Sequence, residues 1–433
     1  MATFLGEDVN ELKNFSIIVL SSLSAFIFWI IIRLRSGANL KPNFDGKPNE
    51  FTWTTIFLCL WYYSGLVLDG WAHTNGVVDE SFFTKWHAMF YSGFIAFAGF
   101  TIWTLWRIYE GPIPTNFSSL TKFLKGMPKG YGFATAGMLT FGLAGIGDMI
   151  WHIVFGIEGG LDILLSPTHI LLAVGMFIAI LAPFWSSWHY SNEEEHTFKG
   201  QLAPIVSLSI SMSVLTFFTR FAHPFNLKLS EICQGHGNPL SNAALNCPSS
   251  LRLHGGTPSL IYDQTGLQLG VTSMIFQSFL IVGVILLFVK RWNPAKGSLF
   301  TLILLNGIAI SFQIPGKLEI VPIRILFFAL VGIICEILAL KFNPKLGGLK
   351  LRVFSFLLPF LYMIIWWLTV ILENRVNIDS LINLNQGIIY PLGWSIHATL
   401  GAFFLAGCSG LFTSILVNPP NIDNLKEVIP SGE

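Results

Sequence analysis

Charged side chains are scarce in this 433-residue chain: Lys, Arg, Asp and Glu together make up only 11% of it. Soluble domains carry about 25%, so this composition excludes an ordinary soluble protein. The net charge of +1 also argues against a nucleic-acid-binding surface, which needs a clear basic excess. The opening residues, MATFLGEDVNELKN, lack the basic segment of a secretory signal peptide, and no cleavable signal is expected.

Long apolar runs dominate the chain instead. Hydrophobic residues account for 53% of it and aromatic residues for 14%, and the mean hydropathy is +0.63. Runs of about 20 apolar residues can cross a hydrocarbon core about 30 Å thick. We therefore expect one all-α polytopic membrane domain, 1–433, a bundle of about eleven transmembrane helices: 15–34, 51–72, 86–108, 131–154, 168–190, 203–222, 266–289, 298–313, 319–340, 352–373 and 391–417. The eighth run is short, contains Gly307 and precedes Pro315, so ten helices is the alternative.

Basic residues are concentrated in alternate connections between these runs. Three Lys or Arg residues occur in each of the segments 34–50, 109–130, 290–297 and 341–351. The connection 74–85 has only Lys85. Because cytoplasmic loops carry the excess of Lys and Arg, the N-terminus is expected outside and the C-terminus inside. The expected location is the plasma (cytoplasmic) membrane.

The longest polar segment, 223–265, is then an external loop. It contains Cys233 and Cys247, two of the five cysteines. On the oxidising side of a membrane, two loop cysteines indicate a disulfide. Metal binding together with His236 or His254 is the alternative for this pair.

Two polar stretches within the apolar background repeat each other. The first is LDGWAHTNGVVDESFFTKWHAMFYSG, residues 68–93, and the second is GDMIWHIVFGIEGGLDILLSPTHILLAVG, residues 147–175. They lie in the helix pairs 51–108 and 131–190. The matched positions are Asp69 with Asp148, His73 with His152, Glu80 with Asp162, Thr84 with Ser166, His87 with His169, and Gly93 with Gly175.

The spacing within each copy predicts a metal site. Asp and His at i and i+4 share one face of a helix, here at its outer end. The second His falls at the start of the returning helix, where Thr84 or Ser166 can cap the helix N-terminus. A short loop between antiparallel helices would bring one carboxylate and two imidazoles together, and such a set forms a facial metal site with open positions. A proton relay or a set of purely structural hydrogen bonds are the alternatives.

Other polar residues near the same membrane face are weaker candidates. His397 could be a seventh ligand or a hydrogen-bond donor to a ligand, but a buried core histidine is the simpler interpretation. Arg220 and His223, in TRFAHP, could bind a polar group, but interfacial anchors that extend toward water are the simpler interpretation.

The second copy resembles a known signature. GDMIWH followed by LLSPTHILLAVG is similar to the metal-binding motif in the C subunit of copper membrane monooxygenases, the particulate methane and ammonia monooxygenases. The resemblance implies that Asp148, His152 and His169 are metal ligands, with Ser166, Pro167 and Thr168 forming the turn before the last of them. It covers about 30 residues per copy. The family subunit has one such triple, whereas this chain has a second, Asp69, His73 and His87, without the proline.

The resemblance implies a membrane-embedded oxidoreductase that uses copper and O2 to oxidise a small apolar substrate from the bilayer. Iron and zinc are alternative metals, because imidazole suits all three. A zinc-dependent intramembrane hydrolase and a metal or proton transporter are the alternative functions. Partner subunits or a homo-oligomer are possible assemblies. Of the two triples, the one with Pro167 is expected to bind metal more tightly, because proline stiffens the helix start and Lys85 places a cation near the other.

Overall fold

The computed structural model confirms an all-helical membrane architecture. It describes residues 3–4, 7–43, 47–74, 77, 82–109, 111, 113–156, 161–191, 193–226, 264–313, 318–373, 382–383, 388–389 and 394–420. Within this part of the chain, ten helices are long and apolar enough to cross a membrane. The eighth predicted span is a shorter apolar helix, Ser298–Gln313. The orientation of the helices across the membrane stays a prediction.

The chain forms two compact units, a division that the sequence did not indicate. Unit 1 comprises Met1–Thr219 and Pro294–Leu318, and unit 2 comprises Arg220–Asn293 and Glu319–Glu433. Residues 227–263, which include Cys233 and Cys247, lie outside the described residues. The predicted disulfide therefore stays a prediction.

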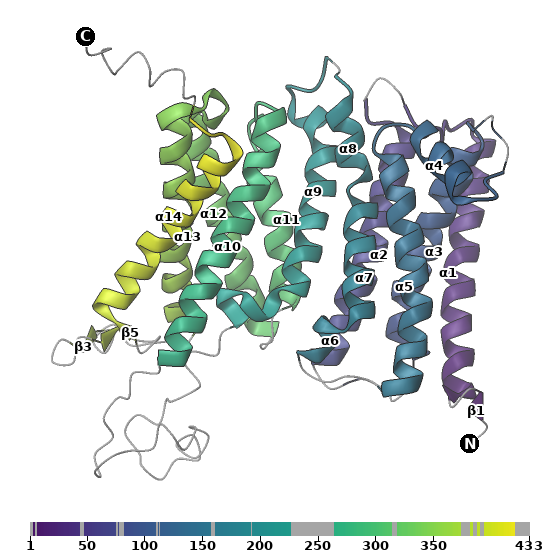
Figure 1. The fold of residues 1–433 in the computed structure, drawn as a ribbon, viewed down its shortest axis with the longest axis horizontal. Coiled ribbons are helices and arrows are strands. Elements are labelled where there is room, and N and C mark those ends of the chain that lie inside the picture. Colours follow the sequence, from purple (N-terminus) through teal and green to yellow (C-terminus); the bar gives the residue numbers. More distant parts are fainter. Residues whose placement is uncertain are drawn as a thin grey trace. The chain divides into compact units, whose positions relative to one another are not determined.

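Unit 1 contains ten helices and one two-stranded ribbon in its described part (Figure 1). The helices are α1 (Val9–Arg35), α2 (Glu50–Thr74), α3 (Lys85–Trp106), α4 (Phe117–Gly126), α5 (Tyr131–Phe155), α6 (Asp162–Leu165), α7 (Pro167–Ile180), α8 (Ala182–His189), α9 (Phe198–Phe218) and α11 (Ser298–Gln313). Strands β1 (Thr3–Phe4) and β2 (Glu7–Asp8) pair antiparallel. Helices α7 and α8 together form one span, Pro167–His189.

Unit 2 is built on four long helices, α10 (Gln264–Arg291), α12 (Val321–Phe342), α13 (Gly348–Glu373) and α14 (Ile396–Val417). Its short elements among the described residues are the 3-10 turns η1 (Arg220–Ala222), η2 (Pro224–Asn226) and η6 (Pro344–Leu346), and the strands β3 (Ile382–Asn383), β4 (Ile388–Ile389) and β5 (Trp394–Ser395), which form an antiparallel ribbon. The turn η5 (Leu318–Ile320) lies at the boundary between the units.

Helices α2 and α3 pack as an antiparallel pair, and so do α5 and α7. Each pair is close enough for its backbones to touch at a glycine of the repeat. A Cβ atom on Gly93 would lie 2.7 Å from the Cα of Tyr62, and one on Gly175 would lie 2.7 Å from the backbone N of Phe141. Any larger side chain at either glycine would push the two helices apart.

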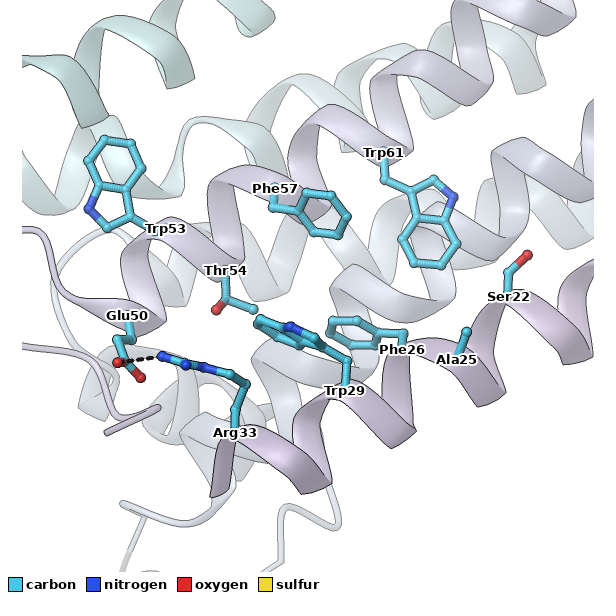
Figure 2. Close-up of a pocket in the computed structure, with 10 residues that line it drawn as sticks. All are labelled: Ser22, Ala25, Phe26, Trp29, Arg33, Glu50, Trp53, Thr54, Phe57 and Trp61. Atoms are coloured by element: carbon cyan, nitrogen blue, oxygen red, sulfur yellow. Dashed lines mark hydrogen bonds and ion pairs between the residues drawn. The ribbon is translucent and has the colours of Figure 1, made fainter. Parts of the chain in front are cut away.

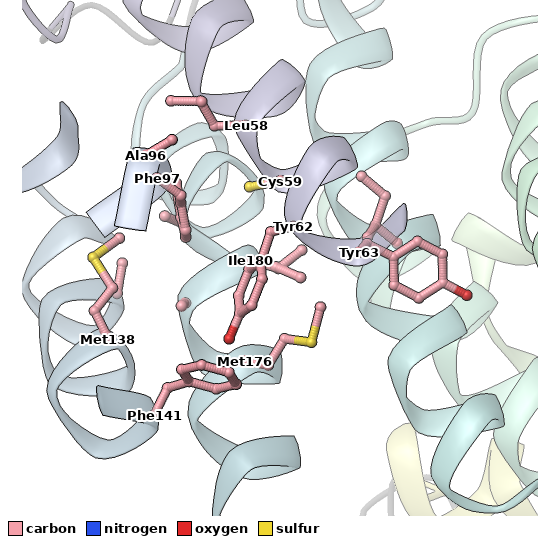
Figure 3. Close-up of a cluster of buried hydrophobic side chains, with 14 of the residues drawn as sticks. Leu58, Cys59, Tyr62, Tyr63, Ala96, Phe97, Met138, Phe141, Met176 and Ile180 are labelled. Carbon is pink, nitrogen blue, oxygen red and sulfur yellow. The ribbon is translucent and has the colours of Figure 1, made fainter. Parts of the chain in front are cut away.

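The two pairs share one apolar core. Tyr62 of the first pair packs edge to face on Phe141 of the second, with ring centroids 5.0 Å apart. Cys59, Met138 and Met176 are buried around these rings (Figure 3). This core holds the two copies of the repeat next to each other at the ends of their helices.

Candidate metal centre

The first Asp-His-His set forms where α2 ends and α3 begins. Asp69 and His73 lie one turn apart near the end of α2, and His87 lies in the first turn of α3. The Nε2 atoms of His87 and His73 are 3.4 Å and 3.8 Å from the two Asp69 carboxylate oxygens. Thr84 is the N-cap of α3 and its side chain accepts a hydrogen bond from the His87 backbone N–H at 3.0 Å, which confirms the predicted cap.

The second set has the same construction at the end of α5 and the start of α7. The Nε2 atoms of His152 and His169 each lie 3.5 Å from one oxygen of Asp148. Ser166 is the N-cap of α7, and its side chain accepts from the His169 backbone N–H at 3.3 Å. Pro167 occupies the first turn of the helix, as expected.

These separations are longer than ordinary hydrogen bonds and are compatible with ligands that share one metal ion. A hydrogen bond to a carboxylate oxygen joins heavy atoms about 2.7–3.2 Å apart. Two ligands that are each roughly 2.0–2.2 Å from one metal lie about 3.3 Å apart at a tetrahedral angle and about 4 Å apart on opposite sides. Within each set, one ligand atom from every residue lies within 4.8 Å of the others.

A backbone carbonyl orients the imidazole ring of His87. Its Nδ1 lies 2.6 Å from the carbonyl oxygen of Phe82. A carbonyl oxygen only accepts, so Nδ1 carries a proton and donates this hydrogen bond. Nε2, the other ring nitrogen, faces a carboxylate oxygen of Asp69 at 3.4 Å and is the atom positioned to bind a metal ion. A backbone carbonyl behind the ring is also the usual support of a histidine that binds metal.

The second set has comparable support for its imidazoles. Ser166 Oγ lies 2.6 Å from Nδ1 of His169, and the carbonyl oxygen of Gly156 lies 3.4 Å from Nδ1 of His152. In both His152 and His169, as in His87, Nδ1 faces a protein group and Nε2 faces the carboxylate.

The carboxylate of the second set is buried, and removing its charge from water costs free energy. Asp148 is 1% exposed. Its described partners are the two imidazoles and the hydroxyl of Thr168, and the described residues place no Lys or Arg in ion-pair contact with it. A buried carboxylate needs a compensating cation, and a metal ion held by the two imidazoles would supply one.

The two sets are separate but adjacent. The ring of Phe82 packs against His87 at 5.1 Å and against His152 at 6.0 Å between centroids. His73 interacts electrostatically with both histidines of the second set. The buried phenol of Tyr91 is within electrostatic range of both aspartates. Two metal ions bound here would therefore occupy neighbouring centres.

The sets differ in the residue before the second histidine. Thr168 donates a hydrogen bond to Asp148 Oδ1 at 2.8 Å, and its counterpart in the first set is Trp86. This contact was not anticipated from the sequence, although Thr168 is adjacent to His169. Lys85 is exposed, and its ammonium lies 4.8 Å from the centroid of the Trp86 ring. Its charge is thus screened by solvent, and the predicted difference in affinity between the sets rests on the Thr168 contact and Pro167 instead.

The weaker candidates, His397, Arg220 and His223, belong to neither of the two metal-ligand groups found among the described residues. The expectation for His397 was wrong: it is exposed in the first turn of α14 and is not a core histidine. His223 was expected to extend toward water, but it is 2% exposed. Its Nδ1 accepts a hydrogen bond from the Phe225 backbone N–H at 3.2 Å. Glu80 lies outside the described residues.

An apolar cavity of about 720 Å³ lies in unit 1 beside α2. Its lining includes Leu68, Trp71 and Trp86, which neighbour the ligands of the first set in the sequence, and Ile210 and Phe312 from α9 and α11. No metal ligand of either set lines it. The cavity therefore provides an apolar space near the first centre without opening directly onto it.

Comparison of the chain with protein-family models, with curated proteins and with solved structures finds no match.

Proposed function

We propose that this protein is a membrane-embedded, metal-dependent oxidoreductase whose two Asp-His-His sets hold copper and use O2 to oxidise a small apolar substrate. The observation that carries metal binding is the spacing in each set, where two imidazole Nε2 atoms lie 3.4–3.8 Å from the oxygens of one carboxylate. The choice of copper and O2 rests on the resemblance of GDMIWH and LLSPTH to the monooxygenase motif.

The chemistry of the donor set supports an open metal site. Two imidazoles and one carboxylate on one side of an ion leave coordination positions free, as in sites that bind O2. A bound copper or iron ion would supply the redox chemistry. The protein would hold the ion through its Asp and His side chains, and the backbone carbonyls of Phe82 and Gly156 and the hydroxyl of Ser166 orient three of the imidazoles.

The position of the sets favours an enzyme over a transporter. All six ligands lie in the last turns of α2 and α5 or the first turns of α3 and α7, at one end of these helices. Transporter sites lie near the middle of the bilayer at breaks in the helices. The apolar cavity beside Trp71 and Trp86 offers room for a substrate that arrives through lipid.

Elemental analysis of protein purified without chelators tests the proposal. We expect copper or iron at up to two ions per chain, with loss of one ion when Asp148 is replaced by Ala and of the other when Asp69 is replaced. Protein from cells grown with added copper should also give a Cu(II) paramagnetic signal. A matched control is Asn306→Ala, which removes a buried polar side chain elsewhere in unit 1 and should leave the metal content unchanged.

Two outcomes would overturn the proposal. Protein that contains no metal and cannot be loaded with any would exclude metal binding at these residues. Stoichiometric zinc without redox activity would favour the intramembrane hydrolase, in which the metal generates hydroxide from water at neutral pH.

A further inference from the structure

A groove separates α1 from α2 in unit 1, at the end of α2 that is farthest from Asp69. Helix α1 packs mainly against α3, which leaves space between α1 and α2. The groove has a volume of about 820 Å³ and is lined by residues of these two helices alone (Figure 2). Only Val19 of α1 is buried, so the open side of this helix faces the surroundings of the protein.

Aromatic side chains from both helices form the walls of the groove. Trp29 stacks on Phe26 at 5.9 Å, and Trp61 packs edge to face on Phe26 at 6.2 Å between ring centroids. Trp53 and Phe57 complete the wall on α2 (Figure 2). Phe26 also packs on Phe100 of α3, which anchors the inner side of the groove to the core.

One ion pair closes the interfacial end of the groove. Arg33 Nη2 and Glu50 Oε1 are 2.7 Å apart, at the last turn of α1 and the first turn of α2 (Figure 2). Both side chains are partly exposed, at 38% and 44%. The lining carries no other charged residue. The charged end is thus zwitterionic, with a cation and an anion side by side.

The length of the groove matches one leaflet of a bilayer. Its lining runs from Ser22 to Arg33 on α1 and from Trp61 to Glu50 on α2. Eleven residues of helix rise about 16 Å, and half of a hydrocarbon core about 30 Å thick is about 15 Å. The groove therefore runs from the interface to about the middle of the membrane.

We propose that this groove binds one zwitterionic phospholipid, with an acyl chain along the aromatic walls and the headgroup on the ion pair. The phosphate would accept hydrogen bonds from Arg33, and the headgroup ammonium would pair with Glu50. An anionic lipid satisfies Arg33 but places a second negative charge beside Glu50. The bound lipid fills the gap between α1 and α2. This inference does not depend on the metal sites.

Native mass spectrometry tests the proposal. The full-length protein is delipidated and then titrated with phosphatidylethanolamine or with phosphatidylglycerol that has the same acyl chains. We expect one phosphatidylethanolamine to bind per chain, with about tenfold preference over phosphatidylglycerol. Ala25→Trp, which fills the groove, should weaken binding about tenfold, and the smaller Ala25→Leu should weaken it less. The matched control is Leu20→Trp, an exposed position of α1 outside the lining, which should bind lipid normally.

The ion pair is tested separately. Arg33→Gln with Glu50→Gln should remove the preference for phosphatidylethanolamine, whereas Arg35→Gln, outside the lining, should keep it. Equal binding of both lipids to the wild-type protein, or unchanged binding to both Ala25 variants, would overturn the proposal. The proposal would also be overturned if a second copy of the chain occupied the groove and excluded lipid from it. The thermal unfolding midpoint of each delipidated variant in detergent serves as the folding control, so the test does not rely on the metal sites.

Discussion

Tyr62 and Phe141 pack edge to face with their ring centroids 5.0 Å apart and their planes at 89°. Each ring lies seven residues before the aspartate of its own set, Asp69 or Asp148, and each backbone touches a matched glycine on the partner helix. The duplication visible in the polar residues therefore continues into the packing, and the two aromatic rings meet where the two copies join. This contact fixes how the two metal-ligand sets lie relative to each other.

The second set should bind metal more tightly than the first. Replacing His152 with Ala should remove most of the metal from protein purified under limiting metal and abolish activity, whereas His73→Ala should leave part of the metal. The physical reason is that Pro167 stiffens the start of α7 before His169 and that Thr168 donates a hydrogen bond to Asp148. Ligands held in place in this way bind metal better. Inductively coupled plasma mass spectrometry measures the difference. Equal loss from both variants would show that the sets act as one centre.

Thr168→Val should weaken metal binding at the second set by about 10–100-fold, as expected for loss of a hydrogen bond that supports a ligand. The substitution keeps the shape of the side chain but removes the donor to Asp148. Competition with a chelator of known affinity gives the dissociation constant. Thr101→Val is the control, because the Thr101 hydroxyl is buried without a described hydrogen-bond partner. A variant at Thr168 that binds metal like the wild type would contradict this role.

Of two glycine-to-alanine substitutions, only one should lower the stability of the protein. At Gly175 an added Cβ would lie 2.7 Å from the Phe141 backbone N, so α5 and α7 must separate, and overpacking of this kind costs about 1–3 kcal/mol. At Gly99 an added Cβ meets nothing within 4 Å, and alanine stabilises a helix by up to about 1 kcal/mol relative to glycine. Thermal unfolding in detergent should show a lower midpoint for Gly175→Ala and an equal or higher one for Gly99→Ala. A stable Gly175 variant would mean that the helices are not in backbone contact.

His223 should make unit 2 sensitive to acid. Burial, and then the nearby Arg324 cation, lower the pKa of His223 from its ordinary 6.5 to about 3. The unfolded chain therefore binds this proton more readily than the folded one, so the contribution to stability is full above pH 6.5 and decreases as pH falls toward 3. The thermal midpoint of the wild-type protein should fall over this range, and His223→Gln should reduce the dependence. An unchanged pH profile would show that His223 does not control it.

Membrane orientation offers a test of the charge pattern. If the positive-inside rule holds, a cysteine introduced by Lys345→Cys in the turn η6 reacts with a membrane-impermeant thiol reagent only after the cells are opened. Val77→Cys, in the connection between α2 and α3, serves as the external position and should react in intact cells, because the Val77 side chain is exposed. Labelling of the Lys345 position in intact cells would reverse the assigned topology and place both metal-ligand sets on the cytoplasmic side.

Much of this protein follows from its sequence alone. The apolar runs are long enough to require helices in a membrane, because only helices and closed barrels satisfy every backbone hydrogen bond in lipid. The repeat in 68–93 and 147–175 was also sufficient to identify all six candidate ligands, since i, i+4 spacing and a helix N-cap are local features. Both caps, at Thr84 and Ser166, are present in the structure.

Tertiary structure alone decided whether the duplicated ligands form one group or two. Each aspartate pairs with the imidazoles of its own helix pair, and the Phe82 ring contacts His87 of one set and His152 of the other. Sequence spacing could not decide this, because the distance between the sets depends on how Tyr62 and Phe141 pack. The hydrogen bond from Thr168 to Asp148 and the burial of His223 could not be predicted from the sequence for the same reason. Each depends on contacts between different segments of the chain, and local sequence patterns do not specify which segments approach each other.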